Sequence, residues 1–263
     1  MIRALYSAAS GMEANQFLTD VIANNVANAN TAGFKKDRAD FQDLFYQTFR
    51  EAGSTTLTGG QVPSGLRVGL GVQPVSTQKI FTAGSFQQTE NPLDIAVAGD
   101  GFFRVALPDG TTAYTRDGSF QLDGNGQIVT SEGNLLDPPI SIPPDAQLID
   151  IAVDGTVNVL QPGADGALTP VGNILLTRFQ NPAGLRSLGG NLFAETPASG
   201  TPQEGTPSDQ AFGQLRQGFL EQSNVSIVDE LVSLIIAQRA FETNSKAVQV
   251  SDELMSITNN LRR

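Results

Sequence analysis

The fold is decided by the last stretch of the chain, SIVDELVSLIIAQRAFETNSKAVQVSDELMSITNNL (226–261). Apolar residues recur in it every seven positions, and a second apolar run lies beside this row. The row is Ile227, Leu234, Phe241, Val248 and Met255, with Leu231 on the same edge, and the run is Ala247, Val250, Leu254, Ile257 and Leu261. A row that repeats every seven residues predicts a long helix with a partner helix along its length. At about 1.5 Å per residue, this helix is on the order of 50 Å long. The alternative is a long helix packed on its own globular domain.

The other end of the chain supplies a candidate partner helix, residues 2–30. Its apolar residues lie within one broad stripe: Ile2, Leu5, Ala8, Ala9, Met12, Ile22 and Val26. The small residues Ala8, Ala9 and Gly11 permit a neighbouring helix to come close. We therefore predict a self-assembly seam, formed by the two terminal helices and by neighbouring copies of the chain. Its residues are Leu5, Met12, Ile22, Val26, Ile227, Leu231, Leu234, Phe241, Val248, Leu254 and Met255.

Polar residues give further information on both predicted helices. Ser226 with Asp229 matches a capping box, and Glu242 with Lys246 forms a favourable i,i+4 pair. Four asparagines lie near the end of the N-terminal helix, and asparagine is a poor helix former: Asn24, Asn25, Asn28 and Asn30. One interpretation is a fraying end before Gly33, favoured by the last two. The other, favoured by the first two, is burial at subunit contacts, where a polar group fixes the register of the helices.

The composition excludes several classes of function. The chain has 263 residues, 40% of them hydrophobic and 16% charged, which is enough for a sizeable core and one or two domains. Its net charge of −11 argues against electrostatic binding to nucleic acid or to anionic membranes. There is no Cys and no His, which excludes disulfides, the usual zinc sites and nucleophilic mechanisms that use either residue. Residues 1–11 do not resemble a signal peptide, and the apolar run 234–237 is too short to span a bilayer.

The segment after the first helix, residues 31–70, changes character. Phe41, Leu44, Phe45 and Phe49 suggest a short helical or turn segment. Residues 52–65 (AGSTTLTGGQVPSG) are rich in Gly, Ser, Thr and Pro and predict an extended arm. Its candidate contact residues are Thr55, Thr56, Thr58, Gly59, Gly60 and Pro63, because Gly and Pro supply turns and the threonines can hydrogen-bond along an edge strand. The alternative is a disordered surface loop without a mechanical role.

From residue 67 onward the pattern is that of β structure. FFRVAL (102–107) is a plausible strand, and Asp-Gly pairs separate the short apolar runs at 100–101, 109–110, 117–118, 123–124 and 154–155. Asp-Gly between apolar runs is a strong hairpin signal, because type I′ turns need positive φ at both central residues. Their short spacing predicts antiparallel hairpins and not crossover helices.

No motif for catalysis or for a cofactor stands out. The segment DGNGQI (123–128) resembles the middle of a calcium loop but lacks the closing acidic ligand, so a hairpin turn is the favoured interpretation. The Gly-rich segment 59–71 lacks the phosphate-loop and dinucleotide-binding patterns. Glu90, Asp94 and Asp100 could form a glycosidase pair, but sequence cannot show their separation. We predict no enzyme activity, no cofactor and no metal.

The predicted fold class is therefore α+β. The N- and C-terminal helices (1–30 and 226–263) pair as a coiled-coil domain. Residues 31–70 form a connector and an extended arm, and residues 71–225 form a central, antiparallel β-rich domain with a return linker.

Long motifs at both ends and in the middle resemble one known family. They are SAASGMEANQFLTDVIANNVANANTAGFKKDRADFQDLFYQ (7–47), FTAGSFQQTENPLDIAVAGDGFFRV (81–105), YTRDGSFQLDGNGQIVTSEG (114–133) and GFLEQSNVSIVDELVSLIIAQRAFETNSKAVQVSDELMSITNNL (218–261). The chain resembles the bacterial flagellar basal-body rod and hook proteins. Within that family it is most similar to the distal rod type, with the proximal rod type of similar size as the second choice.

The resemblance implies a structural subunit of a tubular helical polymer that transmits torque from motor to hook. Because rods do not bend whereas hooks do, it also leads us to predict that the arm at residues 52–65 makes the tube rigid. It implies a place in the periplasmic rod, export through the flagellar type III apparatus without a cleaved signal peptide, and contacts with other rod proteins, the hook protein and the surrounding ring or bushing proteins. Phe41 and Phe45 resemble the export-gate recognition segment of such subunits, the alternative being a buried pair of core aromatics. A cell-wall glycan hydrolase that uses carboxylates and an adhesin-like binding module are the competing classes.

Overall fold

This computed structural model describes residues 2–54, 61–162, 167–209 and 211–260. The chain divides into two compact units, which are described separately. Unit 1 comprises Met1–Ala27, Asp37–Gln78 and Ser226–Arg263, and unit 2 comprises Asn28–Lys36 and Lys79–Val225.

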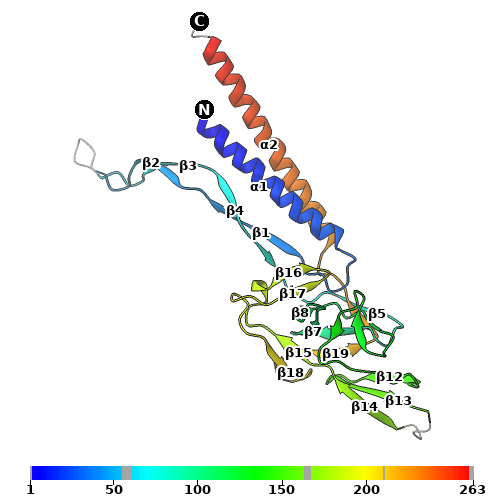
Figure 1. Cartoon of the computed structure of the whole chain (residues 1–263). Coiled ribbons are helices and arrows are strands. Elements are labelled where there is room, and N and C mark those ends of the chain that lie inside the picture. Colours follow the sequence, from blue (N-terminus) through cyan, green and yellow to red (C-terminus); the bar gives the residue numbers. More distant parts are fainter. Residues whose placement is uncertain (1, 55–60, 163–166, 210, 261–263) are drawn as a thin grey trace. The chain divides into compact units, whose positions relative to one another are not determined.

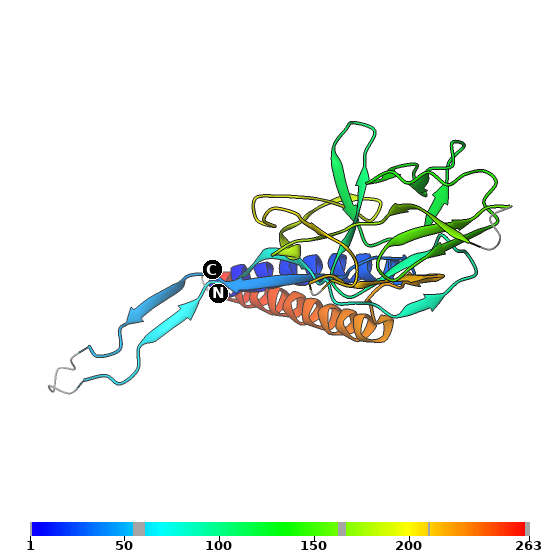
Figure 2. The same cartoon turned by 90° about the horizontal axis from the view of Figure 1, so that it is seen from below.

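Unit 1 contains two long helices. They are α1 (Ile2–Ala27) and α2 (Ile227–Asn260), which run antiparallel and side by side (Figures 1 and 2). The predicted cap at the start of α2 is present, because the Asp229 N–H donates to the Ser226 hydroxyl (3.4 Å) and the Glu230 N–H to the Ser226 carbonyl (3.0 Å). Glu242 pairs with Arg239 (3.3 Å) instead of the predicted Lys246. Neither helix combines the length and apolarity needed to cross a membrane, within the part of the chain that the structure describes.

The rest of unit 1 is a long two-stranded hairpin. Its strands are β1 (Asp37–Asp43), β2 (Tyr46–Arg50), β3 (Leu66–Gly69) and β4 (Val72–Lys79), of which Lys79 belongs to unit 2. β1 pairs with β4 and β2 with β3, in the register Tyr46↔Gly69, and the Leu44 N–H donates to the Gly71 carbonyl between the two pairs (2.8 Å).

The prediction of a short helix or turn at Phe41–Phe49 is therefore wrong. The spacing of the aromatic residues favours a helix locally, but a strand that follows much later in the sequence supplies backbone hydrogen bonds that override this preference. Arg67 stacks over the ring of Tyr46 (5.3 Å), which adds a side-chain contact across the strands.

Unit 2 is the β-rich part of the chain. Its elements are β5 (Phe86–Gln88), β6 (Ile95–Ala98), β7 (Phe102–Ala106), β8 (Thr112–Thr115), β9 (Phe120–Leu122), β10 (Ile128–Thr130), β11 (Leu135–Leu136), β12 (Leu148–Ile151), β13 (Thr156–Leu160), β14 (Leu168–Asn173), β15 (Leu176–Arg178), a 3-10 helix η1 (Pro182–Gly184), β16 (Arg186–Gly189), β17 (Leu192–Ala194), β18 (Gln203–Gly205), β19 (Gln214–Gln217) and β20 (Phe219–Glu221).

The largest sheet of unit 2 has the order β16-β17-β8-β7-β11-β10-β9, with β15 on β7 and β18 on β15. Smaller ladders join β12-β13-β14, β19-β6 and β20-β5, and each of these pairings is antiparallel. The core lies between these strands and includes Ile95, Phe103 and Leu215, with Phe103 packed edge-on against Phe120 at 5.1 Å. The α+β fold class, with terminal helices and a central antiparallel β region, is confirmed.

Three of the five Asp-Gly pairs make the predicted hairpins. They connect β7 to β8, β9 to β10 and β12 to β13. The pairs at 100–101 and 117–118 do not, because the strands that flank them pair elsewhere. At Gly118 the glycine serves close packing instead, since a Cβ there would lie 1.7 Å from the Ile95 carbonyl oxygen.

Candidate assembly surfaces

The face of α2 toward α1 is built from two alternating rows. The sevenfold row contributes Leu234, Val248 and Met255, which are half-buried. A second row, of small and polar residues, follows three positions after members of the sevenfold row: Glu230, Ala237, Asn244 and Ser251. Ala237 is 1% exposed and is the most buried residue of the helix. Alternating steps of three and four residues keep one face of a helix in contact with a neighbouring helix.

Small residues bring the helices close at one point. A Cβ on Gly11 of α1 would lie 2.7 Å from Nδ2 of Asn244 on α2, and Ala8, one turn earlier, is buried. Ala9, by contrast, is exposed. Close approach at the small residues is thus present at Ala8 and Gly11 and absent at Ala9.

A polar network ends the seam at the other end of α1. Asn25 is 1% exposed; its side-chain NH2 donates to the Asp37 carbonyl (2.8 Å) and to a carboxylate oxygen of Glu230 (3.4 Å). Its side-chain oxygen accepts the Asp37 N–H (2.9 Å). Asn25 therefore joins both helices to the start of β1 within one chain, instead of facing another subunit as the sequence suggested.

The predicted seam residues fall into two groups. Ile22 is buried, and Leu5, Met12, Val26, Leu234, Val248 and Met255 are half-buried. Ile227, Leu231, Phe241 and Leu254 remain 40–49% exposed. The second group therefore needs another partner if it is to be buried.

More apolar side chains lie on the rest of α2. We call them the outer surface of α2: Val228 (70% exposed), Val232 (51%), Ile235 (57%), Ile236 (63%), Val250 (55%) and Ile257 (50%). Single exposed apolar residues are common on soluble proteins, but several on one helix mark an interaction surface. Except for Val250 and Ile257, sequence analysis missed them, because they share the helix with the sevenfold row and do not repeat so regularly.

The other predicted residues lie on the hairpin of unit 1. Phe41 is 37% and Phe45 89% exposed, so they do not form a buried pair within the chain. Of the predicted arm residues, Pro63 is exposed, whereas Thr55, Thr56, Thr58, Gly59 and Gly60 lie outside the described residues. Next to them, the Gly53 N–H donates to the Val62 carbonyl (2.8 Å) and the Val62 N–H to the Ser54 carbonyl (3.0 Å), so this part of the hairpin is hydrogen-bonded.

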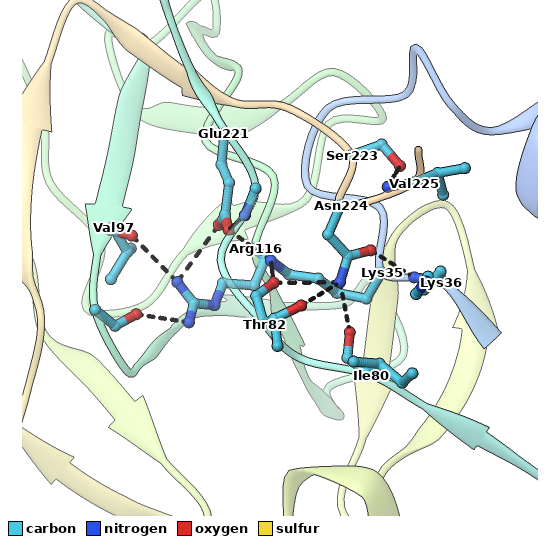
Figure 3. A network of polar contacts seen from close by, with 12 residues as sticks. Lys35, Lys36, Ile80, Thr82, Val97, Arg116, Glu221, Ser223, Asn224 and Val225 are labelled. Atoms are coloured by element: carbon cyan, nitrogen blue, oxygen red, sulfur yellow. Dashed lines mark hydrogen bonds and ion pairs between the residues drawn. The ribbon is translucent and has the colours of Figure 1, made fainter. Parts of the chain in front are cut away.

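Unit 2 contains a buried charged cluster that sequence analysis did not predict (Figure 3). We call Lys35, Arg116 and Glu221 the Glu221 cluster. Glu221 Oε1 accepts from Lys35 Nζ at 2.5 Å, and its Oε2 from Arg116 Nη1 at 3.4 Å. Burial lowers the pKa of Lys35 below its ordinary value, while the Glu221 carboxylate acts in the opposite direction. Burial likewise lowers the pKa of Arg116. The partners lie 186 and 105 residues apart, so no local pattern could reveal them.

The carboxylates considered for other chemistry have structural roles or lie at the surface. Asp123 is in the β9–β10 hairpin, where its carboxylate accepts the Asn125 and Gln127 N–H groups (2.8 Å each), so the hairpin interpretation is confirmed. Asp94 accepts from the Asn91 side chain, and Asp100 lies 3.9 Å from Arg178. Among the described residues, no three acidic side chains gather where they could hold a metal ion.

Models of three flagellar families match successive parts of the chain. Residues 5–35 match the flagella basal body rod protein family, residues 96–159 the D1 domain of the flagellar hook protein FlgE/F/G, and residues 216–261 the C-terminal region of the flagellar basal body rod FlgEFG proteins. The last match covers all of α2 together with Glu221, and the first covers most of α1 together with Lys35.

Full-length relatives agree with these matches. The flagellar basal-body rod protein FlgG of Borreliella burgdorferi is 49% identical, over 100% of both chains. FlgG of Caulobacter vibrioides is 46% identical, over 99% of this chain and 100% of the relative, and FlgG of Bacillus subtilis is 42% identical, over 100% of both. The chain therefore belongs to the family of flagellar basal-body rod proteins related to FlgG, which makes it a structural protein of the flagellar basal body and not an enzyme.

Proposed function

We propose that the chain is a subunit of the distal rod, which assembles with copies of itself into a rigid helical tube. The outer surface of α2 is the observation that carries this proposal. Its six large apolar side chains are each at least half exposed, and burying such surface against other copies contributes roughly 25 cal/mol per Å². The exposed seam residues Ile227, Leu231, Phe241 and Leu254 add further apolar area that is not buried within the chain.

Within each subunit, α1 and α2 act as a two-helix coiled coil. The alternating rows on α2 and the close approach at Gly11 support this arrangement. The row of small and polar residues brings the helices together but buries little apolar area. The pair therefore gains most of its stability in the tube, where the outer surface is covered.

Two pairs of substitutions on α2 test this division of roles. Leu234→Asp with Val248→Asp places charges at half-buried positions of the seam toward α1, and Ile235→Asp with Val250→Asp places them on the outer surface. We expect both double variants to abolish tube formation, judged by electron microscopy of concentrated protein, while unit 2 stays folded. Only the first pair should also reduce the helix content of the monomer. Gln238→Asp, at an exposed polar position of the same helix, is the matched control. Normal tubes from both double variants would contradict the proposal.

The hairpin of unit 1 is the extended arm of the proposal. Residues 52–65, of which the structure describes 52–54 and 61–65, contact a neighbouring subunit, which stiffens the tube so that it can transmit torque. The two-stranded pairing of β2 with β3 supports this proposal, because a hydrogen-bonded ribbon is stiffer than a Gly-rich coil. As a rod, the assembly lies in the periplasm and contacts other rod proteins, the hook protein and the surrounding ring or bushing proteins.

Phe41 and Phe45 form the segment that the type III export apparatus recognises. Their exposure supports this role, because neither aromatic ring is needed for the core of the folded chain. The double variant Phe41→Ala with Phe45→Ala should accumulate inside the cell. Gln42→Ala, at an exposed position between them, is the control. Efficient secretion of the double variant followed by failed polymerisation would assign these residues to packing instead.

A further inference from the structure

The chain leaves unit 2 at or near segments that contact the Glu221 cluster. Unit 2 ends at residues 28, 36, 79 and 225, because it consists of Asn28–Lys36 and Lys79–Val225. Three segments meet at the cluster: residues 32–36, residues 79–85 and residues 221–225 (Figure 3). We call them the three connectors.

Glu221 is the shared partner of the buried charges. Its carboxylate accepts from Lys35 Nζ (2.5 Å), from Arg116 Nη1 (3.4 Å) and from the Gly84 N–H (3.0 Å). The same Lys35 ammonium donates to the Thr82 carbonyl (2.8 Å). The side chains of Lys35 and Glu221 are 0% exposed and that of Arg116 is 3% exposed. A charge buried this deeply is strongly destabilising unless its partner is in place.

Backbone bonds tie the connectors to each other around these charges. The Gly33 N–H donates to the Glu221 carbonyl (2.8 Å), the Ile80 N–H to the Lys36 carbonyl (2.9 Å) and the Gln222 N–H to the Ser85 carbonyl (2.8 Å). Each of these bonds joins a different pair of connectors.

Asn224 adds a side chain that spans all three connectors. Its side-chain oxygen accepts the Lys36 N–H (2.8 Å), and its NH2 donates to the Ile80 carbonyl (2.8 Å). Glycines permit this close packing, since a Cβ on Gly84 would lie 1.9 Å from the Gln222 carbonyl oxygen, and one on Gly33 would lie 2.6 Å from the Asp117 nitrogen.

We propose that Glu221 is the positioning residue of a lock in which the three connectors become ordered, and are released, as one cooperative unit. If one connector opens, the others are left with a buried charge or with unpaired backbone groups, so partial opening is disfavoured. Residues 32–36, near the start of the chain, therefore cannot take up their final structure until residues 221–225, near its end, are in place. If the protein is a rod subunit, as proposed above, this lock transmits the mechanical load that leaves unit 2 along the chain. The lock itself does not depend on that function.

Amide hydrogen exchange of the full-length chain, followed by NMR, tests this directly. Gly33, Gly84 and Gln222 each belong to a different connector. In the wild-type protein their N–H groups should share one opening free energy, because the three connectors open together. In Glu221→Gln, which keeps the shape but removes the charge, exchange at all three should accelerate by about tenfold or more. Exchange at Val157 and Val159 in β13 should change by less than about threefold, since a global loss of stability would accelerate these as well.

Two further variants keep the proposal falsifiable. Glu204→Gln removes the partly exposed partner of Arg104 in the same unit and is the matched control, with no expected effect on the connectors. If Glu221→Gln fails to fold, Asn224→Ala is the milder variant. It should accelerate exchange not only at Lys36, whose bond it removes, but equally at Gly84 and Gln222. Acceleration confined to Lys36, or unequal opening of the three connectors in the wild type, would overturn the lock, whether or not the chain forms rods.

Discussion

Asn25 is a buried polar side chain that joins three segments of unit 1. It satisfies both backbone groups of Asp37 and reaches Glu230, so that α1, α2 and the start of β1 meet at one residue. A helix propensity scale counts this asparagine only as a poor helix former. Its hydrogen bonds explain why it is nevertheless present near the end of α1.

Asn25→Ala should destabilise unit 1 by about 1–3 kcal/mol, because it removes the hydrogen bonds of a buried side chain to both backbone groups of the half-buried Asp37. The measurement is chemical denaturation of the full chain, followed by helix content. Gln16→Ala, at an exposed position of the same helix, is the control and should change the free energy of unfolding by less than about 0.5 kcal/mol. An equal effect of the two substitutions would remove the special role of Asn25.

At the residue scale, the apolar spacing predicts which side chains are buried in the seam, but the sequence does not show which residues form buried ion pairs. Ile22, Leu234 and Val248 were predicted to lie in the seam from their spacing, and they are buried or half-buried. In the sequence Lys35 is only one of two adjacent lysines, and its partner Glu221 lies 186 residues away. No periodicity links residues at that distance, because a buried ion pair is determined by the folded chain and not by local sequence.

The helices, hairpins and turns differ in how well the sequence predicts them. Both helices were predicted because their apolar patterns persist over many turns. The Asp-Gly signal was correct at 109–110, 123–124 and 154–155 and wrong at 100–101 and 117–118. The same dipeptide serves a hairpin in one place and close backbone packing in another, and only the strands that pair on either side distinguish the two.

The hairpin turns make the stability of unit 2 depend on pH in acid. Hydrogen bonds from the Gln127 and Thr156 N–H groups lower the pKa of Asp123 and Asp154, respectively, below the ordinary value of 3.8. Because the pKa is lower in the folded chain, the stabilisation is present above pH 3.8 and is lost as the pH falls below that value. Asp123→Asn with Asp154→Asn keeps the acceptors but removes the titration.

Denaturation of this double variant and of the wild type at about pH 6 and about pH 3 provides the measurement. The stability of the double variant should fall less between the two pH values. The same fall in both proteins would show that these turns do not contribute to the acid dependence.

The stiffness of the proposed tube is predicted to depend on the hairpin of unit 1. Deletion of residues 52–65 should preserve export and polymerisation but produce a curved or compliant tube, because the proposed contact with a neighbouring subunit is lost. Replacement of the same residues by a Gly/Ser linker of equal length separates contact from chain length and should also give compliant tubes. Electron microscopy of the tubes measures their curvature. Straight, stiff tubes from both variants would support a surface loop without a mechanical role.

At the scale of the whole molecule, the sequence predicted the architecture better than the surfaces. The α+β class was predicted from the apolar patterns of the terminal helices and the Asp-Gly pairs between them, and the family from long motifs at both ends and in the middle of the chain. The exposed face of α2 could not be predicted, because burial depends on which side α1 covers. Val228 and Ile236 are as apolar as Leu234, yet they are 70% and 63% exposed while Leu234 is half-buried.

The central claim is that the outer surface of α2 becomes buried when subunits assemble. The chain contains no cysteine, so a single introduced thiol reports on one position without interference. Ile235→Cys tests the outer surface, and Ala237→Cys, at a position that is 1% exposed in the single chain, is the buried reference.

Both variants are labelled with a maleimide as monomers and as assembled tubes. We predict that Cys at position 235 reacts readily in the monomer and becomes as slow as the buried reference in the tube. Equally fast labelling of position 235 in monomer and tube would contradict the account.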